Sequence, residues 1–202
     1  MQIINQDVSR CIEEGIGLKI DLGAGPVARP GFFSLDHLPL KGVDIVADLN
    51  KPFELLPDGC CTHLTAYHVL EHIVDLLPMM AEVHRILAPG GIFDVVVPHF
   101  ANPFAYSDPT HVRFFGIYSM HYFADGDDQP GARRIPNFYA PTRFRIEDIR
   151  VRFEVGGMID GILGRAMNRL VNRNFESMAQ WERRAAWLIK PAEIHYRLRP
   201  KK

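Results

Sequence analysis

The chain has 202 residues, 47% of them hydrophobic, which is enough for one globular domain with a sizeable core. No apolar run approaches the length of a membrane-spanning helix, and residues 1–17 lack the basic start and apolar core of a signal peptide. The three cysteines, at positions 11, 60 and 61, show no disulfide-framework spacing, so we expect a reducing, cytoplasmic setting.

The net charge is −1, but the charges are unevenly distributed along the chain. Residues 133–202 are basic, whereas the part before them is acidic. This asymmetry is compatible with an anionic or lipid-linked partner, but a solvated helical face is the favoured single explanation. No basic patch interleaved with aromatic residues is present, so nucleic acid is not expected as a partner. The sequence does not indicate an oligomeric state.

Short apolar runs, each followed by turn-forming residues, predict strands that alternate with helices. Helices are expected over residues 5–14, from Asp75 to Gly90, and over most of 159–188. This alternation predicts an α/β fold, a single Rossmann-like domain with a doubly wound, mainly parallel sheet. The predicted strands cover residues 18–22, 32–36, 43–47, 62–67, 92–97, 144–155 and 192–198.

The turn after the first strand contains Gly23 and Gly25, which tolerate positive φ and leave backbone bare for a ligand. Through Ala28 the turn also matches Gly-x-Gly-x-x-Ala, a weak dinucleotide pattern that requires a helix to begin there. Pro26 and Pro30 oppose such a helix, so a ligand without a pyrophosphate is favoured over a nicotinamide cofactor. We expect no full helix between the first two strands.

Asp36 ends the second predicted strand, one strand beyond the glycine turn. A carboxylate at this place commonly accepts hydrogen bonds from ribose hydroxyls in Rossmann-like folds. The alternative is a surface Asp in a turn. Further along, residues 98–142 contain no long periodic element and are interpreted as an acceptor-side loop or lid, while 156–190 form a helical segment of the same domain.

Several motifs in order carry a family resemblance. They are Asp-Leu-Gly-Ala-Gly-Pro (21–26), Leu-Asp (35–36), Asp-Leu-Asn (48–50), Tyr-His-Val-Leu-Glu-His (67–72) and Arg-Ile-Leu-Ala-Pro-Gly-Gly (85–91). Together they resemble the class I S-adenosylmethionine-dependent methyltransferases. They are most similar to small predicted methyltransferases associated with cell-surface polysaccharide biosynthesis, in which Asp-Pro-Thr-His (108–111) also recurs.

The resemblance implies an enzyme that transfers a methyl group from S-adenosylmethionine to a hydroxyl or amine of a small molecule or sugar. It implies Asp21, Gly23 and Gly25 along the methionine part of the cofactor, Asp36 at the ribose, Asp48 and Leu49 at the adenine, and Tyr67 and His68 near the sulfonium. Members of the family usually have a helix between the first two strands, and this chain has only residues 26–31 there. A degenerate or non-catalytic binding module is therefore the alternative function.

A histidine suits the role of base for the methyl acceptor near neutral pH. Asp108-Pro109-Thr110 is a turn-forming sequence that could fix His111, so His111 is the leading candidate and His68 or His99 the next. The alternative for His111 is a purely structural role in the turn. The candidates are His68, His72, His99, His111 and His121.

Residues 68–72 also match His-x-x-Glu-His, the inverted zinc-peptidase pattern. That pattern needs both histidines on one helix face, whereas Tyr67-His68 is expected to close a strand. A zinc hydrolase is therefore less favoured than a methyltransferase, and we assign no residue to a metal.

Overall fold

The computed structural model describes residues 1–27, 29–131, 133–153 and 158–202. Eight strands in this part of the chain form one sheet with the order β1-β4-β3-β2-β5-β6-β8-β7. The pairs β2–β3, β3–β4, β2–β5 and β5–β6 are parallel, whereas β1, β8 and β7 join antiparallel. The strands are β1 (Gln2–Ile3), β2 (Leu18–Leu22), β3 (Phe33–Asp36), β4 (Ile45–Val46), β5 (Cys61–Tyr67), β6 (Leu87–Pro98), β7 (Phe144–Arg152) and β8 (Glu193–Pro200).

The chain enters the parallel part of the sheet at β2, builds outward through β3 and β4, and then returns to the other side of β2 with β5 and β6. This reversal next to β2 is the switch point of a doubly wound sheet, where the carboxyl ends of the strands leave a crevice for ligands. The predicted fold class, a mainly parallel Rossmann-like sheet, is confirmed.

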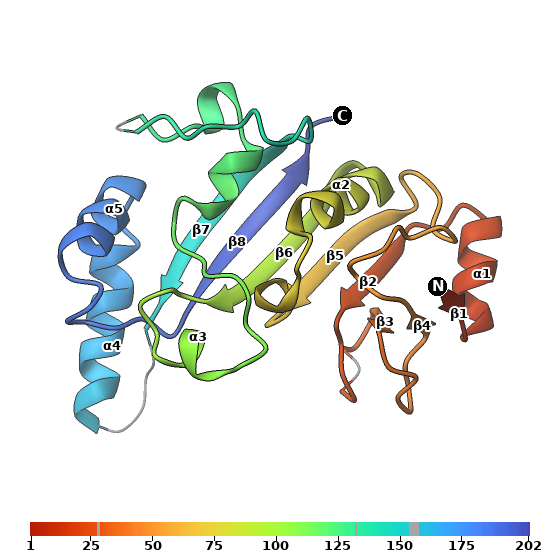
Figure 1. Ribbon diagram of the computed structural model, residues 1–202, viewed down its shortest axis with the longest axis horizontal. Helices are drawn as coiled ribbons and strands as arrows, with labels where there is room; N and C mark the ends of the chain where they lie inside the picture. The colour runs from red at the N-terminus through yellow and green to blue at the C-terminus, as the bar shows by residue number, and fades with distance from the viewer. Residues whose placement is uncertain (28, 132, 154–157) are drawn as a thin grey trace.

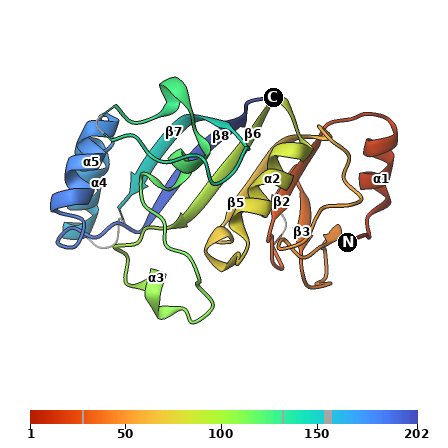
Figure 2. The ribbon, with the colours of Figure 1, turned by 45° about the horizontal axis from the view of Figure 1, so that its top comes forward.

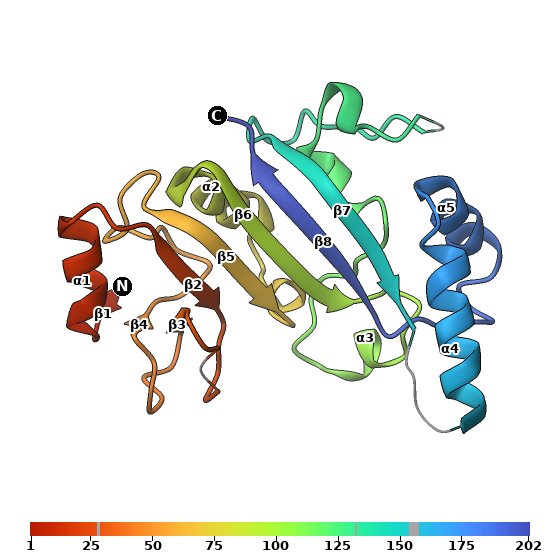
Figure 3. The same ribbon diagram turned by 180° about the vertical axis from the view of Figure 1, so that it is seen from behind.

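The helices gather on one side and at the two ends of the sheet (Figure 1). Helix α2 and the segment that follows β6 lie over one face, α1 lies at the β1 end, and α4 and α5 lie beyond β7 (Figures 1 and 2). Seen from behind, no described helix crosses β2, β5, β6, β8 or β7 (Figure 3). The helices are α1 (Gln6–Glu13), α2 (Leu76–Ile86), α3 (Phe104–Ser107), α4 (Met158–Val171) and α5 (Phe175–Arg184), with short 3-10 helices η1 (Leu70–His72), η2 (Ser119–Phe123) and η3 (Gly126–Asp128).

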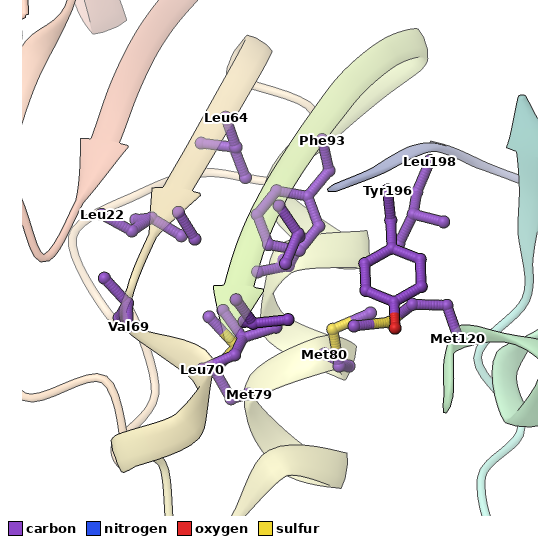
Figure 4. Close-up of a cluster of buried hydrophobic side chains, with 14 of the residues drawn as sticks. Leu22, Leu64, Val69, Leu70, Met79, Met80, Phe93, Met120, Tyr196 and Leu198 are labelled. Carbon is purple, nitrogen blue, oxygen red and sulfur yellow. The ribbon is translucent and has the colours of Figure 1, made fainter. Parts of the chain in front are cut away.

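The core lies between the sheet and α2, where side chains from both layers interdigitate (Figure 4). Phe93, Tyr196 and Leu198 point from the strands toward Met79 and Met80 of α2, and all five are buried. The Tyr196 hydroxyl donates to the Gly116 carbonyl at 2.6 Å, which ties the segment after β6 to the sheet. Each such apolar side chain contributes about 1.5–3 kcal/mol when removed from water.

The opposite face of the central strands is polar because side chains alternate along a strand. Asp94, next to the inward-facing Phe93, accepts from Arg197 Nε at 2.7 Å and lies 2.9 Å from His63 Nε2. Glu147 of β7 likewise pairs with Arg199 of β8. The described part of the sheet therefore has one apolar face under helices and one face covered by cross-strand ion pairs.

Most predicted elements agree with the structure, and their ends differ for identifiable reasons. No helix occurs among the described residues between β2 and β3, as predicted. Helix α2 ends at Ile86, not at Gly90, because Leu87 already pairs with Cys61 and begins β6. Residues 98–142 are only partly a loop, since they contain α3, η2 and η3 and contribute Phe115 and Ile117 to the core.

Some of the residues in the predicted elements lie outside the part of the chain that the structure describes. Ala28 lies outside them, as do the last residues of the expected strand 144–155 and the first two of the segment 156–190. That segment contains two helices, α4 and α5, rather than one. Within the described residues, no helix combines the length and the hydropathy needed to cross a membrane.

His121 of η2 is buried, with 4% of its surface exposed. Its Nδ1 lies 3.1 Å from the Ile117 carbonyl, and its ring packs against Phe175. Burial disfavours the charged ring and lowers the pKa of His121 to about 4. His121 is therefore a neutral core residue and not a base for a ligand.

This burial predicts a pH-dependent stability. Between the usual histidine pKa of about 6.5 and the native value, only the unfolded chain takes up the proton, so stability is present above that window and lost as the pH falls through it. Relative to a His121→Asn variant, the wild type should lose roughly 1–2 kcal/mol of unfolding free energy between about pH 7.5 and pH 5. Urea unfolding at both pH values measures this difference, and a constant difference would contradict it.

Candidate functional site

A cleft of about 700 Å³ opens where β2, β3 and β5 end, at the switch point of the sheet. Five segments from separate parts of the chain build it: the turn after β2, the end of β3, the loop after β4, the turn into η1, and the 108–111 turn. The lining residues are Gly23, Asp36, His37, Asp48, Leu49, Asn50, His68, Val69, His72, Ile73 and Thr110.

The glycine turn forms one wall of the cleft in a conformation that suits glycine. Gly23 and Gly25 have φ of +64° and +60°. A Cβ on Gly23 would lie 2.5 Å from Val69 Cγ2, so the turn and the η1 side of the cleft are in direct contact there. A Cβ on Gly25 would meet nothing within 4 Å. Gly23 is therefore required by its packing against Val69 as well as by its backbone angle, whereas Gly25 is required by its backbone angle alone.

Asp36 is 6% exposed, yet its side chain lines the cleft. Its Oδ2 accepts from Gly25 N at 2.9 Å and its Oδ1 from Leu38 N at 3.0 Å. His37 Nδ1 also lies 3.1 Å from Oδ1, whereas Oδ2 keeps a further lone pair that can accept from a ligand hydroxyl. These hydrogen bonds fix the carboxylate in place before any ligand arrives.

Asn50 organises the opposite side of the cleft. Its Oδ1 accepts from Val74 N at 3.0 Å and from Asp75 N at 3.2 Å, which positions the chain entering α2. Asp75 occupies the N-cap position of that helix, but its side chain makes no capping hydrogen bond. Asn50 N donates to Asp48 Oδ1, and this bond lowers the pKa of Asp48.

A second cleft of about 560 Å³ adjoins the first, and His68 and His72 line both. It lies between η1, the segment after β6 and the start of β8. Part of the 98–142 segment thus lines this cleft. The lining residues are His68, Glu71, His72, Pro98, Asn102, Phe104, Ser107, Asp108, His111, Ala192 and Glu193.

His68 stands at the junction of the two clefts. Among the described residues, it is the non-glycine residue with a positive φ, of +55°. Its N–H donates to the Val96 carbonyl. Its Nε2 lies 3.1 Å from Glu193 Oε2 and its Nδ1 3.5 Å from Glu71 Oε1. The Glu193 hydrogen bond, with Glu71 second, raises the pKa of His68 to about 9. His68 is therefore cationic near neutral pH and a donor rather than a proton acceptor.

His111 and His72 lie together beside the buried Glu71, with ring centroids 4.7 Å apart. His111 Nδ1 is 3.0 Å from the Ala105 carbonyl, and His72 Nδ1 is 3.0 Å from Thr110 Oγ1. The Val112 and Arg113 N–H groups both donate to the Glu71 carbonyl, which holds the 108–113 turn against η1. The Ala105 carbonyl thus holds the His111 ring, and the Glu71 carbonyl holds the backbone of its turn.

Five of the eight residues predicted to bind the cofactor line the first cleft, namely Gly23, Asp36, Asp48, Leu49 and His68. Asp21 is buried beneath it, where Thr65 Oγ1 donates to its Oδ1 at 2.5 Å and Arg29 Nε lies 3.4 Å from Oδ2. Gly25 contributes through its hydrogen bond to Asp36. Tyr67 faces a different depression with Asp94 and His195, and Arg29 stacks on its ring at 4.1 Å.

Among the lining residues to which sequence reasoning gave no role, three take part in the contacts described above. Asn50 and Glu71 were within quoted motifs but received no role. Glu193 had no local signal, because its contact with His68 spans 125 positions of the chain. Of the remaining histidine candidates, His99 is fully buried, with its Nδ1 accepting from Ala101 N, and it lines neither cleft.

Comparisons with known proteins concern part of the sequence and the fold. The methyltransferase domain family matches residues 33–95, which include Asp36, the loop after β4 and the strand–turn–helix around η1. No curated protein sequence matches the chain.

Two solved structures share the fold. One is an S-adenosylmethionine-dependent methyltransferase from Archaeoglobus fulgidus, with 15% identity, a TM-score of 0.57, and coverage of 97% of this chain and 92% of that one. The other is a Haloferax volcanii complex of a methyltransferase with the activator Trm112, with 14% identity, a TM-score of 0.53, and coverage of 96% and 88%. The fold is that of these methyltransferases. Together with the domain match, it supports the prediction of an S-adenosylmethionine-dependent methyltransferase with that compound as cofactor.

The two glycines provide a matched pair of variants. Alanine at either position costs roughly 1–2 kcal/mol because of the left-handed backbone. Gly23→Ala also collides with Val69, so it should destabilise the protein by about 1 kcal/mol more than Gly25→Ala and narrow the cleft. Denaturant unfolding of both variants measures this difference, and equal losses would show that Val69 moves aside freely.

Proposed function

We propose that this protein transfers a methyl group from S-adenosylmethionine to a hydroxyl or amine of a small molecule or sugar. The observation that carries the proposal is the meeting of two clefts at His68 and His72, with the fixed carboxylate of Asp36 in the first. A cofactor in one cleft and an acceptor in the other would place their reactive atoms side by side at this junction.

The residues of the first cleft fit the cofactor. Asp36 offers carboxylate lone pairs suited to ribose hydroxyls, and the turn at Gly23 leaves backbone free of side chains. Asp48, Leu49 and Asn50 supply the polar and apolar edge that an adenine ring requires. The described chain from Gly23 to Phe32 has no helix whose N-terminus could face a pyrophosphate, which fits a cofactor without one.

Bound S-adenosylmethionine would supply a sulfonium methyl group, whose carbon–sulfur bond breaks with the electron pair kept by sulfur while the acceptor gains the methyl and loses a proton. The chain's own contribution is positioning. Asp36 and the Gly23 turn hold the donor side, and the segment after β6 holds the acceptor side, so two reactants are brought into one orientation. This explains why no nucleophilic serine or cysteine is needed.

For the acceptor we propose the second cleft, next to His111 and under the start of the 98–142 segment. Asn102, Ser107 and Asp108 line it with groups that can hydrogen-bond the hydroxyls of a sugar. A sugar acceptor is also what the resemblance to polysaccharide-associated methyltransferases suggests. His111 lies on the acceptor side, whereas His68, already cationic, is better suited to orient a ligand than to remove its proton.

Cofactor binding is tested with Asp36→Asn, which keeps the shape of the side chain and removes its charge. Affinity for S-adenosylmethionine should fall by roughly 1–3 kcal/mol, about 5- to 150-fold, from loss of charge-assisted hydrogen bonds to the ribose. Calorimetric titration of wild type and variant measures the loss. Asp7→Asn, an exposed change on α1 outside both clefts, should leave affinity unchanged.

Absence of any heat with a folded wild-type sample would overturn the proposed cofactor. Tight binding of a nicotinamide dinucleotide instead would favour an oxidoreductase. Binding of S-adenosylmethionine without turnover across a broad acceptor screen would favour a non-catalytic module.

The acceptor side is tested with His111→Ala. Turnover should fall by about 100-fold or more, while affinity for S-adenosylmethionine holds, because His111 lines only the second cleft. Single-turnover rates with the best acceptor of a sugar and small-molecule screen measure this effect. If turnover survives and only the melting temperature falls, His111 is a structural residue of the 108–113 turn.

A further inference from the structure

Glu71, His72 and His111 form a cluster that the methyl-transfer chemistry above does not explain. One ligand-type atom from each side chain lies within 4.8 Å of the others. Two of the residues are neighbours in η1, and the third comes from the 108–113 turn that hydrogen-bonds to η1. The cluster lines the second cleft, here called the acceptor cleft, and His72 also lines the first, here called the cofactor cleft.

Glu71 is the unusual member of this cluster because it is 1% exposed and poorly satisfied. Neither of its carboxylate oxygens has a hydrogen-bond partner among the described residues. The nearest cationic or ring nitrogens are His68 Nδ1 at 3.5 Å and His111 Nε2 at 4.0 Å from Oε1. Cationic His68 offsets part of the carboxylate charge from 3.5 Å, but because no described donor hydrogen-bonds either oxygen, both keep lone pairs free for a further cation.

The hydrogen bonds of the two histidines decide which ring nitrogens are free. His111 Nδ1 faces a carbonyl, which can only accept, so this nitrogen carries the proton and Nε2 carries the lone pair in the neutral ring. Thr110 Oγ1 gives its proton to Asp108 Oδ1 at 2.5 Å, so it accepts from His72 Nδ1. In both rings a protein acceptor holds Nδ1–H, the arrangement that orients metal-binding imidazoles.

His111 Nε2 lies 4.0 Å from Glu71 Oε1, a separation that one ion at about 2.0–2.2 Å from each atom would span. We propose that Glu71, His72 and His111 bind a divalent transition-metal ion such as Zn²⁺ or Mn²⁺. Two imidazoles and one carboxylate are a common ligand set for such ions and leave coordination positions open. All three side chains line the second cleft, so a ligand in that cleft could reach the ion.

The role of this ion rests on the proposed function. An acceptor hydroxyl that coordinates the ion would have a lowered pKa and would release its proton to solvent water in the open cleft as the new bond to the methyl carbon forms. The favoured acceptors are then oxygen ligands, such as a sugar diol or a hydroxy acid. His111 would act as a metal ligand, and its proposed importance for turnover would follow from this rather than from proton abstraction.

Metal binding is tested on the whole chain with the ion alone. After removal of metals with a chelator, Zn²⁺ and Mn²⁺ are titrated calorimetrically into wild type, Glu71→Gln, His111→Gln and the control His84→Gln, whose site on α2 lies outside both clefts. One ion should bind wild type and the control alike, and about 10-fold or more weaker to the two cluster variants. Absence of binding, or equal affinity in all four proteins, would overturn the proposal and leave a protonated His111 as the partner of Glu71.

A second measurement needs no variant. Zn²⁺ added to wild type should shift the imidazole Nε2 resonances of His72 and His111 in nitrogen-15 spectra and leave those of His84 unchanged. Shifts confined to other histidines would overturn the assignment. The two proposals fail separately: Asp36→Asn should lose affinity for S-adenosylmethionine but keep Zn²⁺, whereas Glu71→Gln should lose Zn²⁺ but keep S-adenosylmethionine.

Discussion

The parallel pairing of β2 with both β3 and β5 is the constraint on which both clefts depend. Because these strands run side by side in one direction, everything that follows their carboxyl ends meets at the same edge of the sheet. The glycine turn, Asp36 and the His68 turn are brought together in this way from positions far apart in the chain. The acceptor side is added when the segment after β6 hydrogen-bonds to the Glu71 carbonyl.

The positions of the central strands and their mainly parallel arrangement were predictable, because apolar runs that end at recognisable turns alternate with helical segments. Positive φ at Gly23 and Gly25 was likewise predictable, because glycine tolerates this backbone conformation. The end of α2 was not, since Leu87 pairs with Cys61 in spite of its helical spacing. The core role of Phe115 also escaped prediction, because a segment without periodicity gives no sign of which side chains it buries.

The place of a site residue was predictable where the residue lies at the end of its own strand. It was not predictable where partners distant in the sequence determine the position or charge of the side chain. Asp36 lines the cleft because it terminates β3, whereas Asp21, one strand away, is engaged by Thr65 and Arg29. The cationic character of His68 comes mainly from Glu193, at the start of the last strand. No spacing rule within the sequence connects such a pair; only the antiparallel insertion of β8 beside β6 does.

The one-sided helical layer makes the two faces of the sheet respond to different physical conditions. The core face depends on water exclusion, which added salt strengthens slightly, whereas the ion pairs of Asp94 with Arg197 and Glu147 with Arg199 are partly open to mobile counter-ions. A high salt concentration therefore weakens the ion pairs on the polar face of β6, β8 and β7 and slightly strengthens the packing on their apolar face. These three strands should accordingly differ from β2 and β5 in how ionic strength alters their amide exchange.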